Sequence, residues 1–264
     1  MKGIGLEIEV IKSLTDNYIW ILINYNKSSA FVVDPGEASA VLSWLKKRKI
    51  NLLGILITHH HPDHTMGVEG LLNCYDVPVY GPHNSPANCI TEKLQENDDL
   101  IFHGKKFRVI EVPGHTHDHI AYFSSQTFGA NHILFAGDTL FGGGCGRLFE
   151  GTAQQMHGSL EKIKELPQNT LIYSGHEYTI ANLNFAISIE PNNDALKQRY
   201  LNDLQKRNMN QPTLPSLLSL ELATNPFLRV KNNSVISAVH EKFNINDDSE
   251  YVIFEALRKW KDIF

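Results

Sequence analysis

The segment THHHPDH at residues 58–64 follows an apolar, β-branched run at 52–57 and precedes a helical stretch that starts at Met66. Imidazole and carboxylate groups at this density are typical of zinc, iron or manganese sites. Alternate residues of an extended backbone face the same side, so His59 and His61 point together. The proline ends the strand, and the turn after it presents Asp63 and His64 from a second direction. The segment therefore predicts two adjacent metal ions, one bound by each pair.

Three more candidate ligands each follow a predicted strand beside a glycine, which lets the backbone approach a site closely. They are His115 in PGHT, Asp138 in GDT and His176 in GHE. Because His117 and His119 share the alternation of His115, spacing alone leaves three candidates at this position. A carboxylate has two oxygens, so Asp138 can bridge two ions.

The complete set gives each ion three ligands of its own, and the two ions share one carboxylate. Each ion keeps a coordination position for water, which is typical of catalytic metal sites and not of structural ones. The predicted assignment is His59, His61 and His115 on the first ion, Asp63, His64 and His176 on the second, and Asp138 between them. Among the other histidines, we expect His60 and His119 to contact the ligands.

The composition of the 264 residues excludes several classes of protein. The formal charge is −5, so the chain lacks the excess of basic residues expected of a nucleic-acid binder. The chain has thirteen histidines but only three cysteines, an odd number without a CxxC pair, so no disulfide framework is expected. This favours a reducing compartment, and we expect the cytoplasm. The N-terminal stretch MKGIGLEIEVIKSL carries two glutamates and is expected to form a strand rather than a signal peptide. No apolar run is long enough for a membrane span.

The first two thirds of the chain predict an α/β sandwich with sheets inside and helices outside. Short apolar runs predict strands at 18–23, 30–33, 52–58, 107–112, 120–124, 133–136 and 170–173. Helices are expected at 38–47, 66–72 and 154–165. From about residue 178 the periodicity is helical, with helices expected at 178–189, 194–207 and 249–261. We predict a catalytic domain at 1–174 and a smaller helical domain at 175–264.

The motifs THHHPDH, PGHT, GDTLF and GHEYT occur in the order found in the metallo-β-lactamase superfamily, which this chain resembles. Within it, LTDNYIWIL at 14–22, VDPGE, GCGRLFEG at 144–151, TNPFLR and the terminal LRKWKD resemble glyoxalase II, the hydroxyacylglutathione hydrolases. The resemblance covers essentially the whole chain. It implies a four-layer αββα sandwich, a smaller all-α C-terminal domain and the seven ligands above, with His115 chosen over its neighbours.

The resemblance also implies hydrolysis of S-D-lactoylglutathione to glutathione and D-lactate, the second step of methylglyoxal detoxification. A hydroxide held between two divalent ions, zinc first and iron or manganese as alternatives, is expected to attack the thioester. Asp63 and Asp138 are the expected catalytic residues, and the chain is expected to act as a monomer. The implied glutathione contacts are Arg147, Leu148, Phe149, Tyr178, Arg258 and Lys261.

Two residues depart from the family pattern. Phe149 stands where many members have a tyrosine, and the lost hydrogen bond is worth about 0.5–1.5 kcal/mol. Pro62 replaces a common tryptophan. Alternatively, Arg258 and Lys261 form a solvated face paired with Asp262, and Tyr178 is an ordinary packing aromatic.

Three other functions are weighed against the hydrolase. A persulfide dioxygenase of the same superfamily would need only one iron, whereas the second ligand set and the helical domain favour the hydrolase. An RNA-processing nuclease conflicts with the acidic charge. A non-enzymatic metal-binding protein conflicts with the open coordination positions.

Overall fold

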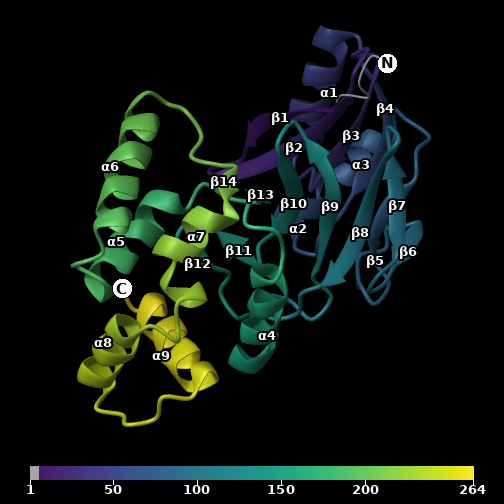
Figure 1. Ribbon diagram of the computed structural model, residues 1–264. Coiled ribbons are helices and arrows are strands. Elements are labelled where there is room, and N and C mark those ends of the chain that lie inside the picture. The colour runs from purple at the N-terminus through teal and green to yellow at the C-terminus, as the bar shows by residue number, and fades with distance from the viewer. Residues whose placement is uncertain (1–5) are drawn as a thin grey trace. The chain divides into compact units, whose positions relative to one another are not determined.

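The computed structural model describes residues 6–264, and these form two compact units (Figure 1). The first comprises the chain through residue 111 together with 118–137. The second comprises 112–117 and 138–264. The predicted domain boundary after residue 174 falls inside the second unit and stays a prediction.

The first sheet of the first unit runs in the order β1 to β6. Its strands are β1 (Leu6–Ser13), β2 (Asn17–Asn24), β3 (Ser29–Val33), β4 (Asn51–Leu56), β5 (Val79–Pro82) and β6 (Glu92–Leu94). The first three pair antiparallel and the rest pair parallel. The predicted N-terminal strand is confirmed as β1, although residues 1–5 of that prediction lie outside the described residues.

Two helices cover one face of this sheet, α1 (Ala38–Arg48) and α3 (Gly67–Leu72). Val41 and Leu45 of α1 and Val68 and Leu71 of α3 are fully buried against strand residues. Each such side chain contributes about 1.5–3 kcal/mol through the hydrophobic effect. This packing fixes the ends of β3 and β4, from which the ligand-bearing loop begins.

The second sheet of this unit is antiparallel and packs on the other face of the first. Its strands are β7 (Asp99–Phe102), β8 (Lys105–Glu111), β9 (Ile120–Phe128) and β10 (Asn131–Gly137). The rings of Phe31 and Phe102 lie 4.6 Å apart between the sheets. The buried Tyr122 hydroxyl donates to the carbonyl of Ile57 across the same interface at 2.7 Å. The unit is therefore a helix layer over two face-to-face sheets.

The second unit begins with short strands and continues as helices (Figure 1, teal to yellow). Its strands are β11 (Leu140–Phe141), β12 (Gly144–Cys145), β13 (Thr170–Ser174) and β14 (Ser216–Leu217). Its helices are α4 (Ala153–Lys164), α5 (Thr179–Ile189), α6 (Asp194–Asn208), α7 (Leu218–Thr224), the 3₁₀ turn η1 (Pro226–Leu228), α8 (Asn233–Phe243) and α9 (Glu250–Asp262). No helix within residues 6–264 is long and apolar enough to cross a membrane.

The predicted elements are present, with shifts at their ends. The strand expected over 52–58 ends at Leu56, so the histidines lie in a loop and not on extended strand backbone. A four-residue helix, α2 (Pro62–Thr65), starts at the proline because that residue suits the first helical turn. The helices α7 and α8 and the strands β5 to β7 were not predicted. Several of these are short and depend on partners that are distant in sequence.

Candidate metal centre and substrate site

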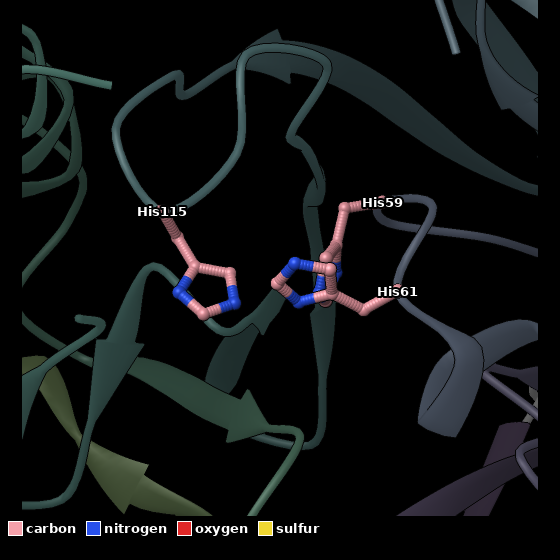
Figure 2. Close-up of side chains that lie close together, drawn as sticks. All are labelled: His59, His61 and His115. Carbon is pink, nitrogen blue, oxygen red and sulfur yellow. The ribbon is translucent and has the colours of Figure 1, made fainter. Parts of the chain in front are cut away.

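The loop after β4 brings His59 and His61 together. Their ring centroids lie 4.8 Å apart, and one ligand nitrogen from each lies within 4.8 Å of the other (Figure 2). His59 is fully buried, whereas His61 is partly exposed. The predicted pairing of these two side chains on one side of the loop is confirmed.

The turn Asp34-Pro35-Gly36 fixes the start of this loop. Both carboxylate oxygens of Asp34 accept bonds from Thr58, one from the backbone N–H and one from the hydroxyl, each at 2.8 Å. A Cβ at Gly36 would lie 2.0 Å from the carbonyl oxygen of Asp63, so only glycine fits there. The VDPGE motif is therefore a support for the ligand loop, a role that its sequence does not reveal.

Asp63 and His64, the second predicted ligand pair, lie on α2. The Asp63 Oδ2 atom lies 3.5 Å from His64 Nε2, and Asn17 donates to that oxygen at 2.9 Å. The Nδ1 atom of His64 lies 3.1 Å from Asp34 Oδ2, so the same aspartate contacts both ends of the loop. This carboxylate orients the buried imidazole and leaves its Nε2 facing Asp63.

Of the two other histidines expected to contact the ligands, His60 belongs to this loop and His119 lies beside it. His119 is buried and stacks on the ring of His59, with centroids 4.6 Å apart. His60 has its Nδ1 atom 2.9 Å from the buried carboxylate of Asp118. The His60 ring also lies edge-on to that of His61, with centroids 5.2 Å apart, so it contacts a predicted ligand.

In the second unit, Asp138 lies between two histidines. Its Oδ2 atom is 3.5 Å from His115 Nε2 and 3.2 Å from His176 Nε2, and all three side chains are buried. His115, drawn in Figure 2 on the loop after β8, contacts the carbonyl oxygen of Arg147 through Nδ1 at 2.8 Å. Because a carbonyl only accepts, Nδ1 carries the proton and Nε2 keeps its lone pair. That is the tautomer which a metal ligand requires.

The ambiguity among the histidines of this segment is reduced by their positions. His117 is exposed, and its backbone N–H donates to Glu150. His119 belongs to the first unit, where it stacks on His59. His115 faces Asp138 within the second unit. The loop that contains Gly146 packs directly against the backbone of Asp138. A Cβ at Gly146 would lie 2.0 Å from the carbonyl oxygen of Asp138, so only glycine allows this approach.

The predicted basic substrate residues gather in the second unit around one carboxylate. Arg258 donates to the Asp262 Oδ1 atom at 3.0 Å, and Arg147 Nε lies 3.5 Å from the same atom. Arg258 also donates to the carbonyl of Cys145 at 3.0 Å. Burial, then the nearby charges of Arg258 and Arg147, lowers the pKa of Lys261. Three cationic side chains therefore share a single anionic neighbour.

The alternative in which Arg258 belongs to a solvated face is wrong, because the residue is only 6% exposed. Its guanidinium also lies over the ring of Phe227, 5.1 Å from the centroid. The alternative predicted the ion pair with Asp262 correctly. Arg147 is by contrast exposed.

The remaining predicted substrate residues flank His115 and His176. The Tyr178 ring stacks on that of His176 at 4.7 Å and 7°, and it is 36% exposed. Phe149 is 61% exposed, with its ring edge-on to His115 at 5.3 Å. Leu148, which precedes Phe149 in the sequence, is partly buried. One face of Tyr178 covers a candidate ligand, and its role in substrate binding stays a prediction.

The glycine turn at residues 142–144, which leads into the Arg147 loop, is fixed by buried polar side chains that sequence reasoning missed. Glu221 accepts from the N–H of Gly143 at 2.9 Å, and Asn225 donates to the carbonyl of Gly144 at 3.0 Å. Asn182 donates to the carbonyl of Gly142 at 3.1 Å. Asn225 belongs to TNPFLR, so this motif supports the turn that leads to Arg147.

The donor sets fit divalent metal ions. Imidazole nitrogens and carboxylate oxygens are the ligands that zinc, iron and manganese accept. In each unit they are held close together by neighbouring polar groups, and His115 presents the required lone pair. The chemistry and burial of these residues therefore match the expected cofactor class.

Comparison with known families agrees with this donor set. The metallo-beta-lactamase superfamily model matches residues 17–176, and the model of the hydroxyacylglutathione hydrolase C-terminus matches 177–264. A hydroxyacylglutathione hydrolase of Chromohalobacter salexigens is 45% identical over 98% of this chain and 100% of its own length. A second, from Alkalilimnicola ehrlichii, is 46% identical over 97% of this chain and 98% of its own length. The chain belongs to the hydroxyacylglutathione hydrolase family.

Solved structures confirm the fold of this hydroxyacylglutathione hydrolase family member. A metallo-beta-lactamase from Staphylococcus aureus covers 97% of this chain and 72% of its own at 20% identity, with a TM-score of 0.64. The protein TTHA1623, solved in a di-iron-bound form, covers 63% and 90% at 26% identity, with a TM-score of 0.52. The predicted metallo-β-lactamase sandwich with a helical C-terminal domain is thus confirmed, and family membership favours a hydrolase over the dioxygenase and the nuclease.

Proposed function

We propose that this protein hydrolyses S-D-lactoylglutathione and related 2-hydroxyacyl glutathione thioesters to glutathione and the free acid. The observation that carries the proposal is the presence, on one chain, of the metallo-β-lactamase ligand motifs and the hydroxyacylglutathione hydrolase C-terminal domain with its cationic cluster. Relatives over nearly the full length bear the same name. Lactate release by this chain would place it in methylglyoxal detoxification.

Two divalent ions are proposed to bind the ligands of both units, with zinc as the first choice and iron or manganese as alternatives. The assignment is His59, His61 and His115 for one ion and Asp63, His64 and His176 for the other, with Asp138 bridging. It is supported by the paired ligands within each unit and by the superfamily match, which spans all seven positions. When bound, such ions activate water and polarise a carbonyl oxygen.

The chain's own residues would orient the reacting groups. Asp63, held by Asn17 through Oδ2, is placed to accept a hydrogen bond from the attacking nucleophile. Asp138 would hold its two neighbouring imidazoles at a fixed spacing. The leaving thiol has an ordinary pKa near 8.5, so it departs as a thiolate with little need for a general acid.

The cationic cluster would bind the carboxylates of glutathione. Arg147 is exposed and shares Asp262 with the buried Arg258, so a substrate carboxylate can take over one of these pairs. Lys261 adds a third positive charge beside them. Tyr178, Leu148 and Phe149 would contact the tripeptide, with Phe149 supplying ring surface but no hydroxyl.

The test is steady-state hydrolysis of S-D-lactoylglutathione against simple non-glutathione thioesters, on a preparation whose metal content is measured. We expect turnover with two ions per chain and a strong preference for the glutathione thioester. Equal activity on all thioesters would refute the assigned substrate class. Asp138→Ala is expected to lose metal and to lower kcat by about 10²–10³-fold; near-normal turnover would refute the bridging role.

We also propose a cytoplasmic monomer. The cytoplasmic location is supported by the cysteines, since Cys74, Cys89 and Cys145 are all free thiols in the described residues. Size-exclusion chromatography with light scattering tests the monomer directly.

A further inference from the structure

A second cluster of metal-ligating side chains lies in the second unit, between α4 and α9. His157 and Glu161 stand one turn apart on α4, and Glu250 is the first residue of α9. One ligand atom from each lies within 4.8 Å of the others. None of these residues belongs to the proposed catalytic site.

The spacing within the cluster suits a metal ion better than direct contacts. The His157 Nε2 atom lies 3.5 Å from Glu250 Oε2 and 3.7 Å from Glu161 Oε1, and it makes no hydrogen bond within residues 6–264. Zinc–ligand bonds of about 2.0–2.2 Å in a tetrahedron separate neighbouring ligand atoms by about 3.3–3.6 Å. The two observed separations lie at or just above this range, and both exceed a good hydrogen bond.

Packing orients the imidazole toward the carboxylates. The His157 side chain is 13% exposed, and its ring contacts that of Phe254 on α9 at 5.7 Å. Glu161 and Glu250 are about one third exposed, so an ion can enter from solvent. A buried nitrogen with two accessible carboxylates thus forms a site open on one side, with room for water as the fourth ligand.

Two lysines pair with the same carboxylates, Lys231 on the oxygen of Glu250 that is turned away from His157 and Lys164 on the oxygen of Glu161 that faces His157. Lys231 pairs with Glu250 Oε1 at 2.9 Å, and Lys164 pairs with Glu161 Oε1 at 2.6 Å. Glu250 keeps its Oε2 atom toward His157, whereas an ion bound to Glu161 Oε1 would share that oxygen with the Lys164 ammonium. Both lysines lower the net negative charge, which weakens cation binding without abolishing it.

We propose that His157, Glu161 and Glu250 bind a third divalent ion of the zinc class, which joins α4 to the first turn of α9. Imidazole nitrogen and carboxylate oxygen are both ligands that zinc accepts. Because α9 also carries Arg258 and Lys261, the ion would stabilise the helix that supplies the cationic cluster.

The experiment is equilibrium dialysis of the holoprotein against a series of zinc-ion buffers, with bound metal counted by mass spectrometry. We expect wild type to bind one zinc ion more than His157→Gln, and Glu250→Gln to bind it about tenfold more weakly or worse. Retention of the first two ions shows that the variants are folded. The control is His240→Gln, which removes a histidine 3.1 Å from one carboxylate, Asp248, and should keep the third ion.

Two outcomes would overturn the proposal. If the wild-type protein never bound more than two zinc ions per chain, the three side chains would form no metal site. A third ion that persists in His157→Gln would place it elsewhere.

The lysines provide an independent check on location. Lys231→Ala removes the competing cation and should tighten zinc binding at the third site by about threefold or more. Lys259→Ala is the matched control, because Lys259 pairs with Glu255 on α9 at 3.0 Å, outside the cluster. Equal affinities in the two variants would contradict the assigned ligands.

Discussion

Replacing Glu221 by alanine should remove the centre of the buried polar network that holds the glycine turn. The Glu221 side chain is completely buried and accepts hydrogen bonds on both oxygens. Its Oε1 atom accepts from Arg199 and Ser216, each at 2.5 Å, and its Oε2 atom from Gly143 and Asn225 at 2.9 and 3.2 Å. Four buried donors would therefore lose their acceptor together.

The ion pair with Arg199 sets the magnitude. Both side chains are at most 1% exposed, so Glu221→Ala leaves a buried guanidinium with Thr224 and the more distant Asp203. Breaking one partner of such a pair costs about 3–5 kcal/mol. That is a large part of a total stability of about 5–15 kcal/mol. We expect a clearly lowered midpoint in urea, measured by circular dichroism at fixed free metal concentration.

Two further variants separate the charge from the packing. Lys197→Ala breaks an exposed pair with Asp194 on the same helix, α6, and should cost less than about 1 kcal/mol. Glu221→Gln combined with Arg199→Met removes both charges and should cost less than Glu221→Gln alone. If Glu221→Ala were no worse than Lys197→Ala, or if the double variant cost the sum of its parts, the reasoning would be refuted.

Three further predictions concern the substrate loop and its neighbours. Phe149→Tyr restores a hydroxyl and should lower KM for the glutathione thioester about 2–10-fold with kcat unchanged, and a raised KM would count against this contact. Burial and nearby cations lower the pKa of Lys261 below its usual 10.5. At pH values just below 10.5 the folded chain therefore binds fewer protons than the unfolded chain, so the free energy of unfolding should rise with pH in that range. Lys261→Met should abolish that rise in a urea series and raise KM, whereas an unchanged pH slope would refute the burial argument. Burial raises the pKa of Cys145 to about 11, so iodoacetamide at pH 8 should label the exposed Cys74 and spare Cys145 until urea unfolds the chain; equal native labelling would contradict this.

The local motifs were predictable because their chemistry is contained in a few adjacent residues. THHHPDH brings two ligand pairs together within one loop, whatever the rest of the fold does. The strands and longer helices follow from apolar periods, which depend on neighbours within one or two turns. The exact end of β4 did not follow from these periods: the strand ends at Leu56, and Thr58 then donates two hydrogen bonds to Asp34, a residue 24 positions earlier in the chain.

By itself, the sequence determined the donor chemistry, the α/β class and the helical C-terminal region, and the whole-chain resemblance pointed to the family. Only the tertiary structure decided which histidine of the 115–119 segment faces Asp138, and that Arg258 is buried on Asp262. It alone revealed that Glu221 and Asn225 hold the substrate loop, and that His157 meets Glu250 from a helix more than ninety residues away. Spacing along the chain fixes which face of a single element a side chain shares. Which distant side chains then meet depends on how the elements pack and where the loops bend.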